Sequence, residues 1–172
     1  MALSVNQMDG VVQARFPAGE TNPALGQSRI RRALVWIDDA ATAGTAVGEK
    51  LALYVDATYM PNGVLVKAVN LLPGVAIAGD NTDYVSFLVA SRPVGGGSGA
   101  NIVTQTTKLT GGTGSMTAFV KYTGTVTGAN ARVIATSSIT VAATKATSGK
   151  AITAAAGSDG DKFGIEIVYE IL

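Results

Sequence analysis

Two pairs of aspartates come closest, by residue type and spacing, to a metal site. Asp80 and Asp83 are separated by two residues, and Asp159 and Asp161 by one. Calcium takes oxygen ligands from carboxylates and backbone carbonyls, so each pair could contribute to a calcium-binding loop. Aspartate also favours turns, because its carboxylate accepts hydrogen bonds from nearby backbone N–H groups. We favour turns at both places, expect no cofactor, and keep these four aspartates as weak calcium candidates.

Two glycine-containing stretches partly match phosphate-binding motifs. Gly95-x-Gly97-x-x-Ala100 fits a loose dinucleotide fingerprint, but neither a helical pattern nor a βαβ unit accompanies it. Ser148-Gly149-Lys150 resembles the end of a P-loop, yet Ala151 and Thr144 stand where that motif needs Ser/Thr and Gly. We interpret the first stretch as a flexible loop and reject the second as a phosphate site.

Histidine and cysteine are both absent from the sequence. A hydrolase triad therefore lacks its usual proton shuttle, and no Ser-x-x-Lys supplies the serine–lysine alternative. Zinc would lose its two commonest ligands, and no disulfide can form. We expect a protein without enzymatic activity and without a small-molecule substrate.

Charge is sparse and nearly balanced. Lys and Arg total 13 and Asp and Glu total 12, which gives a net charge of +1. Nucleic-acid binding needs a basic stripe that neutralises phosphates, so we expect no nucleic-acid partner. The arginines that do cluster, Arg29, Arg31 and Arg32, suit an acidic patch on another protein. Because no apolar run approaches the roughly 18 residues of a membrane span, and the N-terminus lacks a signal-peptide pattern, we expect a soluble protein made in a cytoplasm, without a membrane partner.

The chain divides into two segments by pattern. Residues 1–32 are polar, contain Pro17 and Pro23, and show no sustained alternation. They predict an extended N-terminal arm with room for a turn of helix near Ala24 to Ile30. Residues 33–172 are a succession of short alternating segments and glycine-rich turns, and one domain is the default at this length.

Period-two alternation predicts about ten strands in the second segment. The clearest is the last, where one face holds Phe163, Ile165, Ile167, Tyr169 and Ile171. Other strands are expected at 51–59, 64–71, 84–90, 102–107, 116–122, 132–135, 138–143 and 150–154. Short strands rich in Thr, Val and Ala, joined by glycine-rich turns, are typical of antiparallel sandwiches and barrels. We predict an all-β, jelly-roll-like antiparallel β-sandwich and leave its strand order open.

Trp36 is the only tryptophan and has apolar neighbours on both sides. An exposed indole could stack on a sugar ring, because its flat apolar face suits that contact. Tryptophan is highly buried on average, so we favour a place in the core or in a subunit interface.

One stretch, from Leu72 to Val89, combines a proline-containing segment, Ala78-Gly79-Asp80-Asn81-Thr82-Asp83-Tyr84 and an alternating strand. In this order it resembles a recurring group of tailed-phage virion structural proteins. The likeness continues through a glycine-rich loop, a Thr-rich strand and the closing segments, at 95–99, 101–107, 147–152 and 164–172, so that it covers residues 50–172. One departure is Ser158-Asp159-Gly160-Asp161-Lys162, which stands where members of the group often have Ala-Gly-Asp before a strand.

The resemblance implies a jelly-roll-like accessory protein of the capsid decoration, or cement, type. Such a protein would assemble as a homotrimer on the exterior of the virion, with the major capsid protein as its partner. The resemblance carries over no catalytic residues. The alternative class is a glycan-binding or adhesin domain of a phage fibre or spike, for which exposed aromatics beside an ion site would be expected.

Capsid contact is expected in the N-terminal arm, because polar, weakly patterned segments can fold on binding and wrap a neighbour. Arginine and aromatic side chains dominate interface energetics. The expected anchors are therefore Arg15, Phe16, Arg29, Arg31 and Arg32.

Overall fold

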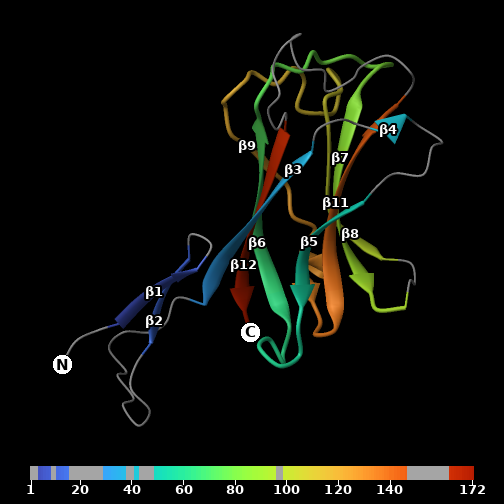
Figure 1. Cartoon of the computed structure of the whole chain (residues 1–172). Coiled ribbons are helices and arrows are strands. Elements are labelled where there is room, and N and C mark those ends of the chain that lie inside the picture. Colours follow the sequence, from blue (N-terminus) through green and yellow to red (C-terminus); the bar gives the residue numbers. More distant parts are fainter. Residues whose placement is uncertain are drawn as a thin grey trace.

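Figure 1 shows the computed structural model of the chain, in which two β-sheets face one another. The structure describes residues 4–8, 11–15, 29–37, 41–42, 49–95, 99–146 and 163–172, with backbone alone at 4–8, 11–15 and 41–42. The strand expected at 150–154 and most of the segment with room for a helical turn lie outside these ranges. The described residues contain no α-helix, and one 3-10 turn, η1, spans Gly128–Asn130.

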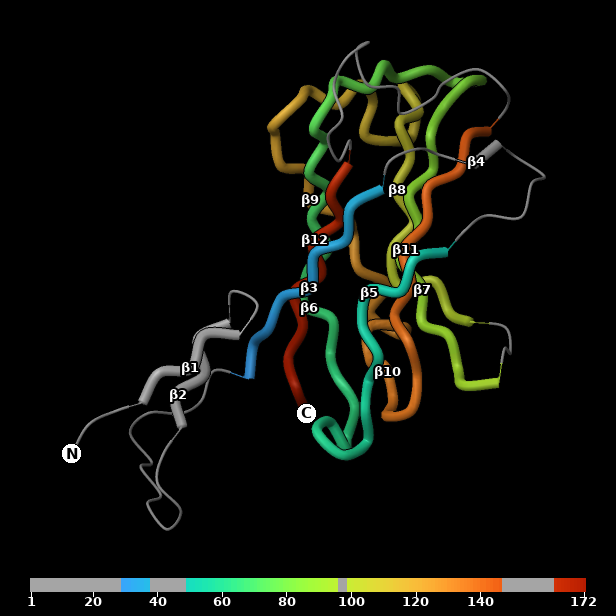
Figure 2. Tube along the Cα trace, in the orientation of Figure 1, coloured from blue at the N-terminus to red at the C-terminus, as the bar shows by residue number. Residues whose placement is uncertain are grey.

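The first sheet is antiparallel throughout. Its order runs from β3 (Ile30–Ile37) to β12 (Phe163–Ile171) to β6 (Val64–Pro73), whose far edge pairs with β9 (Tyr122–Gly124) and β10 (Arg132–Val133). β12 lies in the middle, between β3 and β6, as the red strand of Figure 2 shows. The strongest alternation in the sequence has therefore produced a central strand, because one whole face of β12 can be buried.

The second sheet runs from β5 (Lys50–Val55) to β11 (Ser137–Lys145) to β7 (Val85–Pro93) to β8 (Ala100–Thr106). These four strands are antiparallel, and a short parallel strand, β4 (Ala41–Thr42), pairs with the end of β11. β1 (Ser4–Met8) and β2 (Val11–Arg15) form a separate antiparallel pair within the segment expected to be an arm.

The strand order is that of a jelly roll. With β9 and β10 counted as one position, the eight positions in chain order are β3, β5, β6, β7, β8, β9/β10, β11 and β12. The first sheet then reads 1-8-3-6 and the second 2-7-4-5, which is the double Greek key arrangement of jelly rolls. The predicted all-β antiparallel sandwich is confirmed, and the order that the sequence left open is now assigned.

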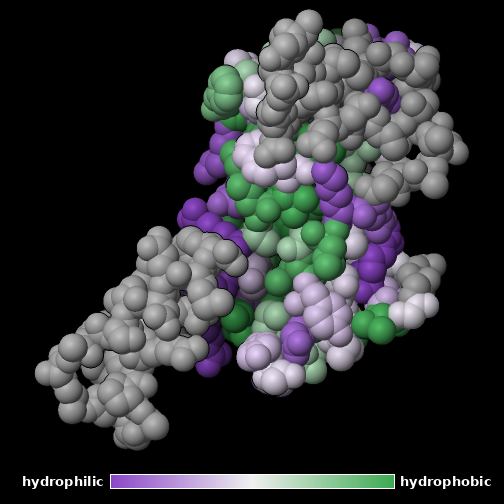
Figure 3. Space-filling model, viewed as in Figure 1, coloured by the Kyte–Doolittle hydropathy of each residue, from purple (hydrophilic) through white to green (hydrophobic). Residues whose placement is uncertain are grey.

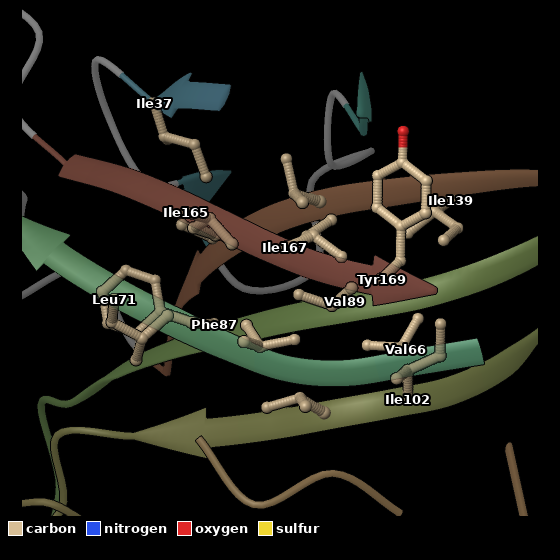
Figure 4. Close-up of a cluster of buried hydrophobic side chains, with 14 of the residues drawn as sticks. Ile37, Val66, Leu71, Phe87, Val89, Ile102, Ile139, Ile165, Ile167 and Tyr169 are labelled. Carbon is tan, nitrogen blue, oxygen red and sulfur yellow. The ribbon is translucent and has the colours of Figure 1, made fainter. Parts of the chain in front are cut away.

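Inward side chains of the two sheets interdigitate in one core (Figure 4). Within it the rings of Phe87 in β7 and Phe163 in β12 stack at 4.0 Å between centroids, with 10° between planes, so the pair joins the two sheets. Other fully buried residues of the core include Leu71, Ile102 and Ile139. In Figure 4 the hydroxyl of Tyr169 points away from the cluster, at one margin of the core.

Several elements differ from the prediction: β5 ends at Val55 and not at residue 59, and β10 covers Arg132–Val133 and not 132–135. β3 begins at Ile30, so residues 30–32 belong to the sandwich. The strand expected at 116–122 is wrong, because Met116 makes a single bridge with Ile77 and Phe119 has a φ of 61°. The physical reason is that β9 occupies the edge of β6 beside these residues, so the chain before it closes the end of the sandwich as a loop.

Candidate functional site

Three of the five expected anchor residues lie in β3 or directly before it. Arg29 precedes β3, and Arg31 and Arg32 are the second and third residues of that strand. Arg15 ends β2, where only the backbone is described, and Phe16 lies outside the described residues. β3 pairs with β12 and with no other described strand, so this arginine cluster lies on an edge of the first sheet.

Alternation along β3 sends its two arginines to opposite faces. Arg31 lies on the inward side, opposite Tyr169 in the register with β12. Burial raises the pKa of the Tyr169 hydroxyl, and the positive charge of Arg31 partly opposes that rise. The Arg31 guanidinium also donates to the backbone oxygen of Ile30 at 3.2 Å. Arg31 therefore borders the core and is only partly accessible to a partner.

Arg32 lies on the outer face and begins a row of polar side chains that crosses four strands. Its guanidinium is 3.3 Å from one carboxylate oxygen of Glu166 in β12. The other Glu166 oxygen accepts a hydrogen bond from the Asn70 amide of β6 at 2.6 Å. The amide oxygen of Asn70 accepts from the Thr123 hydroxyl of β9 at 3.1 Å. We call Arg32, Glu166, Asn70 and Thr123 the polar row.

The polar row leaves cationic groups accessible at its β3 end. The side chain of Arg32 is 73% exposed, whereas that of Glu166 is 18% exposed. The other outward glutamate of β12, Glu170, lies 3.4 Å from the ammonium of Lys67. Both glutamates are therefore already paired with cations, and the exposed charge at the β3 edge is positive.

Trp36 lies on the outer face of β3, with the same parity as Arg32 and Leu34. Its placement in the core, one of the two favoured interpretations, is wrong: the side chain is only partly buried and is absent from the core cluster. A Cβ built on Gly164 would come within 3.1 to 3.3 Å of three carbons of the Trp36 ring. Glycine at 164 thus leaves the space in which the indole lies against the neighbouring strand.

Apolar surface accompanies these polar groups where the edges of the two sheets meet. Figure 3 shows hydrophobic residues gathered over β3 and β5, with hydrophilic residues around them. Leu34 of β3 is 50% exposed and Leu51 of β5 is 60% exposed. The ammonium of Lys50 spans the two edges and donates to the backbone oxygen of Trp36 at 2.8 Å.

Asp80 and Asp83 lie in a tight loop before β7. The Oδ1 atom of Asp80 accepts hydrogen bonds from the backbone N–H groups of Thr82, at 2.7 Å, and Asp83, at 2.9 Å. The carboxylate therefore stabilises its own loop, as turn aspartates do. Within the described residues no three acidic side chains gather as a metal site would require. Asp159 and Asp161 lie outside those residues.

A charged contact on the second sheet was not identified from the sequence. Arg92 of β7 donates to Glu49 through two guanidinium nitrogens, one of them at 2.9 Å. These hydrogen bonds hold the pKa of Glu49 below its ordinary value, against the opposing effect of burial, and a hydrogen bond from Thr140 adds to the lowering. No local pattern signals this pair, because its members are 43 residues apart in the chain.

Neither a protein-family model, nor a curated protein, nor a solved structure matches the chain. In the part of the chain that the structure describes, no helix has the length and apolar character needed to cross a membrane. The arrangement at β3 combines exposed guanidinium groups, apolar side chains and an edge strand. Such a set of groups can bind another polypeptide.

Proposed function

We propose that this chain is a non-enzymatic virion structural protein that binds the exterior of a tailed-phage capsid and stabilises the seams between capsid subunits. The observation that carries the proposal is the residue pattern from Leu72 to Val89, which is similar to that of tailed-phage accessory proteins. The jelly-roll order of the described strands supports it, because that resemblance implies the same fold.

A protein of this kind acts by adhesion. Each contact across a capsid seam removes apolar surface from water, which is worth about 25 cal/mol per Å² before the costs of association are subtracted. Repetition over a symmetric shell multiplies a modest contact. Arg29 and Arg32 are exposed beside apolar Leu34, so this part of β3 offers the cationic and apolar groups that dominate interface energies.

Light scattering and co-sedimentation test the proposal. We expect the purified protein to have the mass of a homotrimer and to sediment with bare capsids. Deletion of residues 1–28, which leaves the described sandwich intact, should weaken capsid binding if the arm contributes contacts. A monomeric chain that remains in the supernatant with bare capsids would contradict the proposed function, and unchanged binding after the deletion would remove the arm from it.

The second candidate, a glycan-binding domain, is favoured by one observation. The Trp36 indole lies on the outer face, beside the donors and acceptors of the polar row. Flat aromatic rings next to such groups suit sugar rings. A glycan array would detect this activity, and Trp36→Ala should abolish it, whereas Trp36→Phe should retain part. Capsid binding with no glycan bound would exclude this candidate.

A further inference from the structure

The four edges of the sandwich differ in how they are protected. An edge strand presents unpaired N–H and C=O groups to other chains, and proteins usually shorten, bend or cover it. β9 and β10 are three and two residues long. β8 and β5 each carry a bulge, at Ile102 and Ala52, where the register with the neighbouring strand shifts. β3 is eight residues long and keeps an unbroken register with β12.

The register also fixes which groups of β3 face outward along the sheet. The backbone N–H of Ile171 donates to the oxygen of Arg29 at 2.9 Å, so odd-numbered residues of this strand are the ones that bond to β12. Even-numbered residues then point their N–H and C=O groups to the open side. The Lys50 bond to the oxygen of Trp36 agrees with this parity. At Arg32 and Leu34 no described residue bonds to the backbone on that side.

Charge adds a chemical preference to this edge. Arg32 makes one contact with Glu166, at 3.3 Å, and a guanidinium has five N–H donors. Exposed Arg29 lies three residues before it. Both carboxylate oxygens of Glu166 are already engaged, with Arg32 and Asn70. A carboxylate from outside would therefore meet guanidinium donors of Arg32 to which the described residues offer no further acceptor.

We propose that β3 accepts an extended acidic segment of another chain as an added strand. Its backbone bonds to Arg32 and Leu34, its apolar side chains cover Leu34, and a carboxylate on its outward face meets Arg32. This is strand addition with side-chain specificity. β12 provides a precedent, because its outward Glu166 already contacts Arg32 from the neighbouring strand. Only the identification of the donor as the capsid protein rests on the proposed function.

Charge complementarity favours this occupant over a second copy of the chain. Pairing β3 with β3 of a second copy would bring more arginines to the same edge and no carboxylate from the strand itself. The strand contains no acidic residue, so neither copy would supply a carboxylate from β3 to the arginines of the other. Self-association through β3 is an outcome that the experiment below separates from the proposal.

A peptide titration tests the proposal directly. The probe is a nine-residue peptide of alternating valine and threonine with two glutamates four residues apart, and the control carries lysines at those two positions. Amide signals of Arg32 and Leu34 should shift on titration into the full chain. At a glutamate peptide concentration of ten times Kd, their hydrogen exchange should slow by about elevenfold. The lysine peptide should change neither signal.

Two substitutions at one position separate the backbone contact from the side chain. Leu34→Pro removes an outward N–H and leaves the bonds to β12, so the chain should stay folded and peptide binding should weaken by about tenfold or more. Leu34→Thr keeps the N–H and should retain most of the binding. If Leu34→Pro does not fold, Arg32→Glu serves instead and should weaken binding of the glutamate peptide to a similar extent.

Several results would overturn the proposal. One is that the glutamate peptide shifts signals only in other strands, and a second is that the lysine peptide binds equally well. A third is that a folded Leu34→Pro variant, or Arg32→Glu in its place, leaves peptide binding unchanged. The fourth is a self-association that Leu34→Pro abolishes without any peptide binding. Sedimentation with capsids is scored separately. Peptide binding at β3 without capsid binding would retain the edge site and contradict the proposed function. If wild type and Leu34→Pro both bind capsids and neither binds the peptide, the proposed function is retained and the edge site at β3 is contradicted.

Discussion

The two sides of the sandwich are closed in different ways. On the side of β8, the chain covers its own edge: Thr127 N–H donates to the oxygen of Ile102 at 2.8 Å, and the Asn130 amide donates to the oxygen of Asn101 at 2.8 Å. On the side of β3, the hydrogen bond between the edge strands comes from a long side chain, that of Lys50. Figure 1 shows β3 and β5 as the two edge strands on this side.

This difference indicates where an external strand has to bind. On the β8 side the sheets approach so closely that a Cβ on Gly124 would lie 2.8 Å from a methyl carbon of Val103. The backbone oxygens of Asn101 and Ile102 are already satisfied within the chain, so a partner gains less there. The β3 side has a regular edge, exposed leucines and arginines. A partner that adds a strand there gains hydrogen bonds and apolar burial together.

The largest effect is expected from the interior, which both sides share. Phe163→Ala removes one ring of the stacked pair that joins the sheets, and we expect the free energy of unfolding to fall by about 3–5 kcal/mol. Phe163→Leu should cost less, because more volume remains. Urea denaturation measures both. If hydrogen exchange showed faster opening on the β3 side alone, the two sides would not share one core.

A smaller loss is expected from crowding the β8 side. Gly124→Ala places a methyl group against Val103, and overpacking of a buried site costs about 1–3 kcal/mol. Gly128→Ala is the matched control, because a Cβ there meets nothing within 4 Å. Thermal unfolding of the two variants gives the comparison. Equal midpoints would mean that β8 and β9 do not approach as closely as described.

Alkaline pH should weaken the β3 side. Burial raises the pKa of Tyr169 above its value in the unfolded chain. Its contribution to stability is therefore complete below the unfolded pKa, about 10, and is lost as pH rises through the folded pKa. Tyr169→Phe should flatten the dependence of the urea midpoint on pH above 9. If the urea midpoint of Tyr169→Phe still fell steeply above pH 9, a group other than Tyr169 would be responsible for the pH dependence.

Local alternation predicted the elements that are buried on one face. The strand expected at 64–71 is observed as β6, two residues longer, and all the inward residues predicted for the last strand lie on the core side of β12. Period two is a property of the strand itself, so it can be found without knowing the partner strand. The same rule failed at 116–122, because a strand there would need a partner. The edge of β6 beside it is already paired with β9.

The candidate site was harder to predict. The sequence placed Arg31 and Arg32 in an arm because an edge strand near solvent needs few apolar residues and therefore resembles a loop. Lys50 and Trp36 lie in different sheets, and Arg92 and Glu49 are 43 residues apart, so their contacts follow from topology. The contact of Arg32 with Glu166 likewise depends on β3 pairing with β12, which the local pattern does not show.

The smallest effect is expected when a single side-chain bond to an edge carbonyl is removed on each side. Lys50→Met and Asn130→Ala each delete a 2.8 Å bond at an exposed site, and each should lower the free energy of unfolding by about 1 kcal/mol or less. The local consequences of the two substitutions should differ.

After Asn130→Ala the Thr127 bond still holds β8, so the Val103 amide should keep its exchange rate. After Lys50→Met the end of β3 is released from β5, so the Ile37 amide should exchange faster. If the exchange rates of the two amides changed equally, both sides would be closed to the same degree. That result would contradict the description of β3 as the open edge.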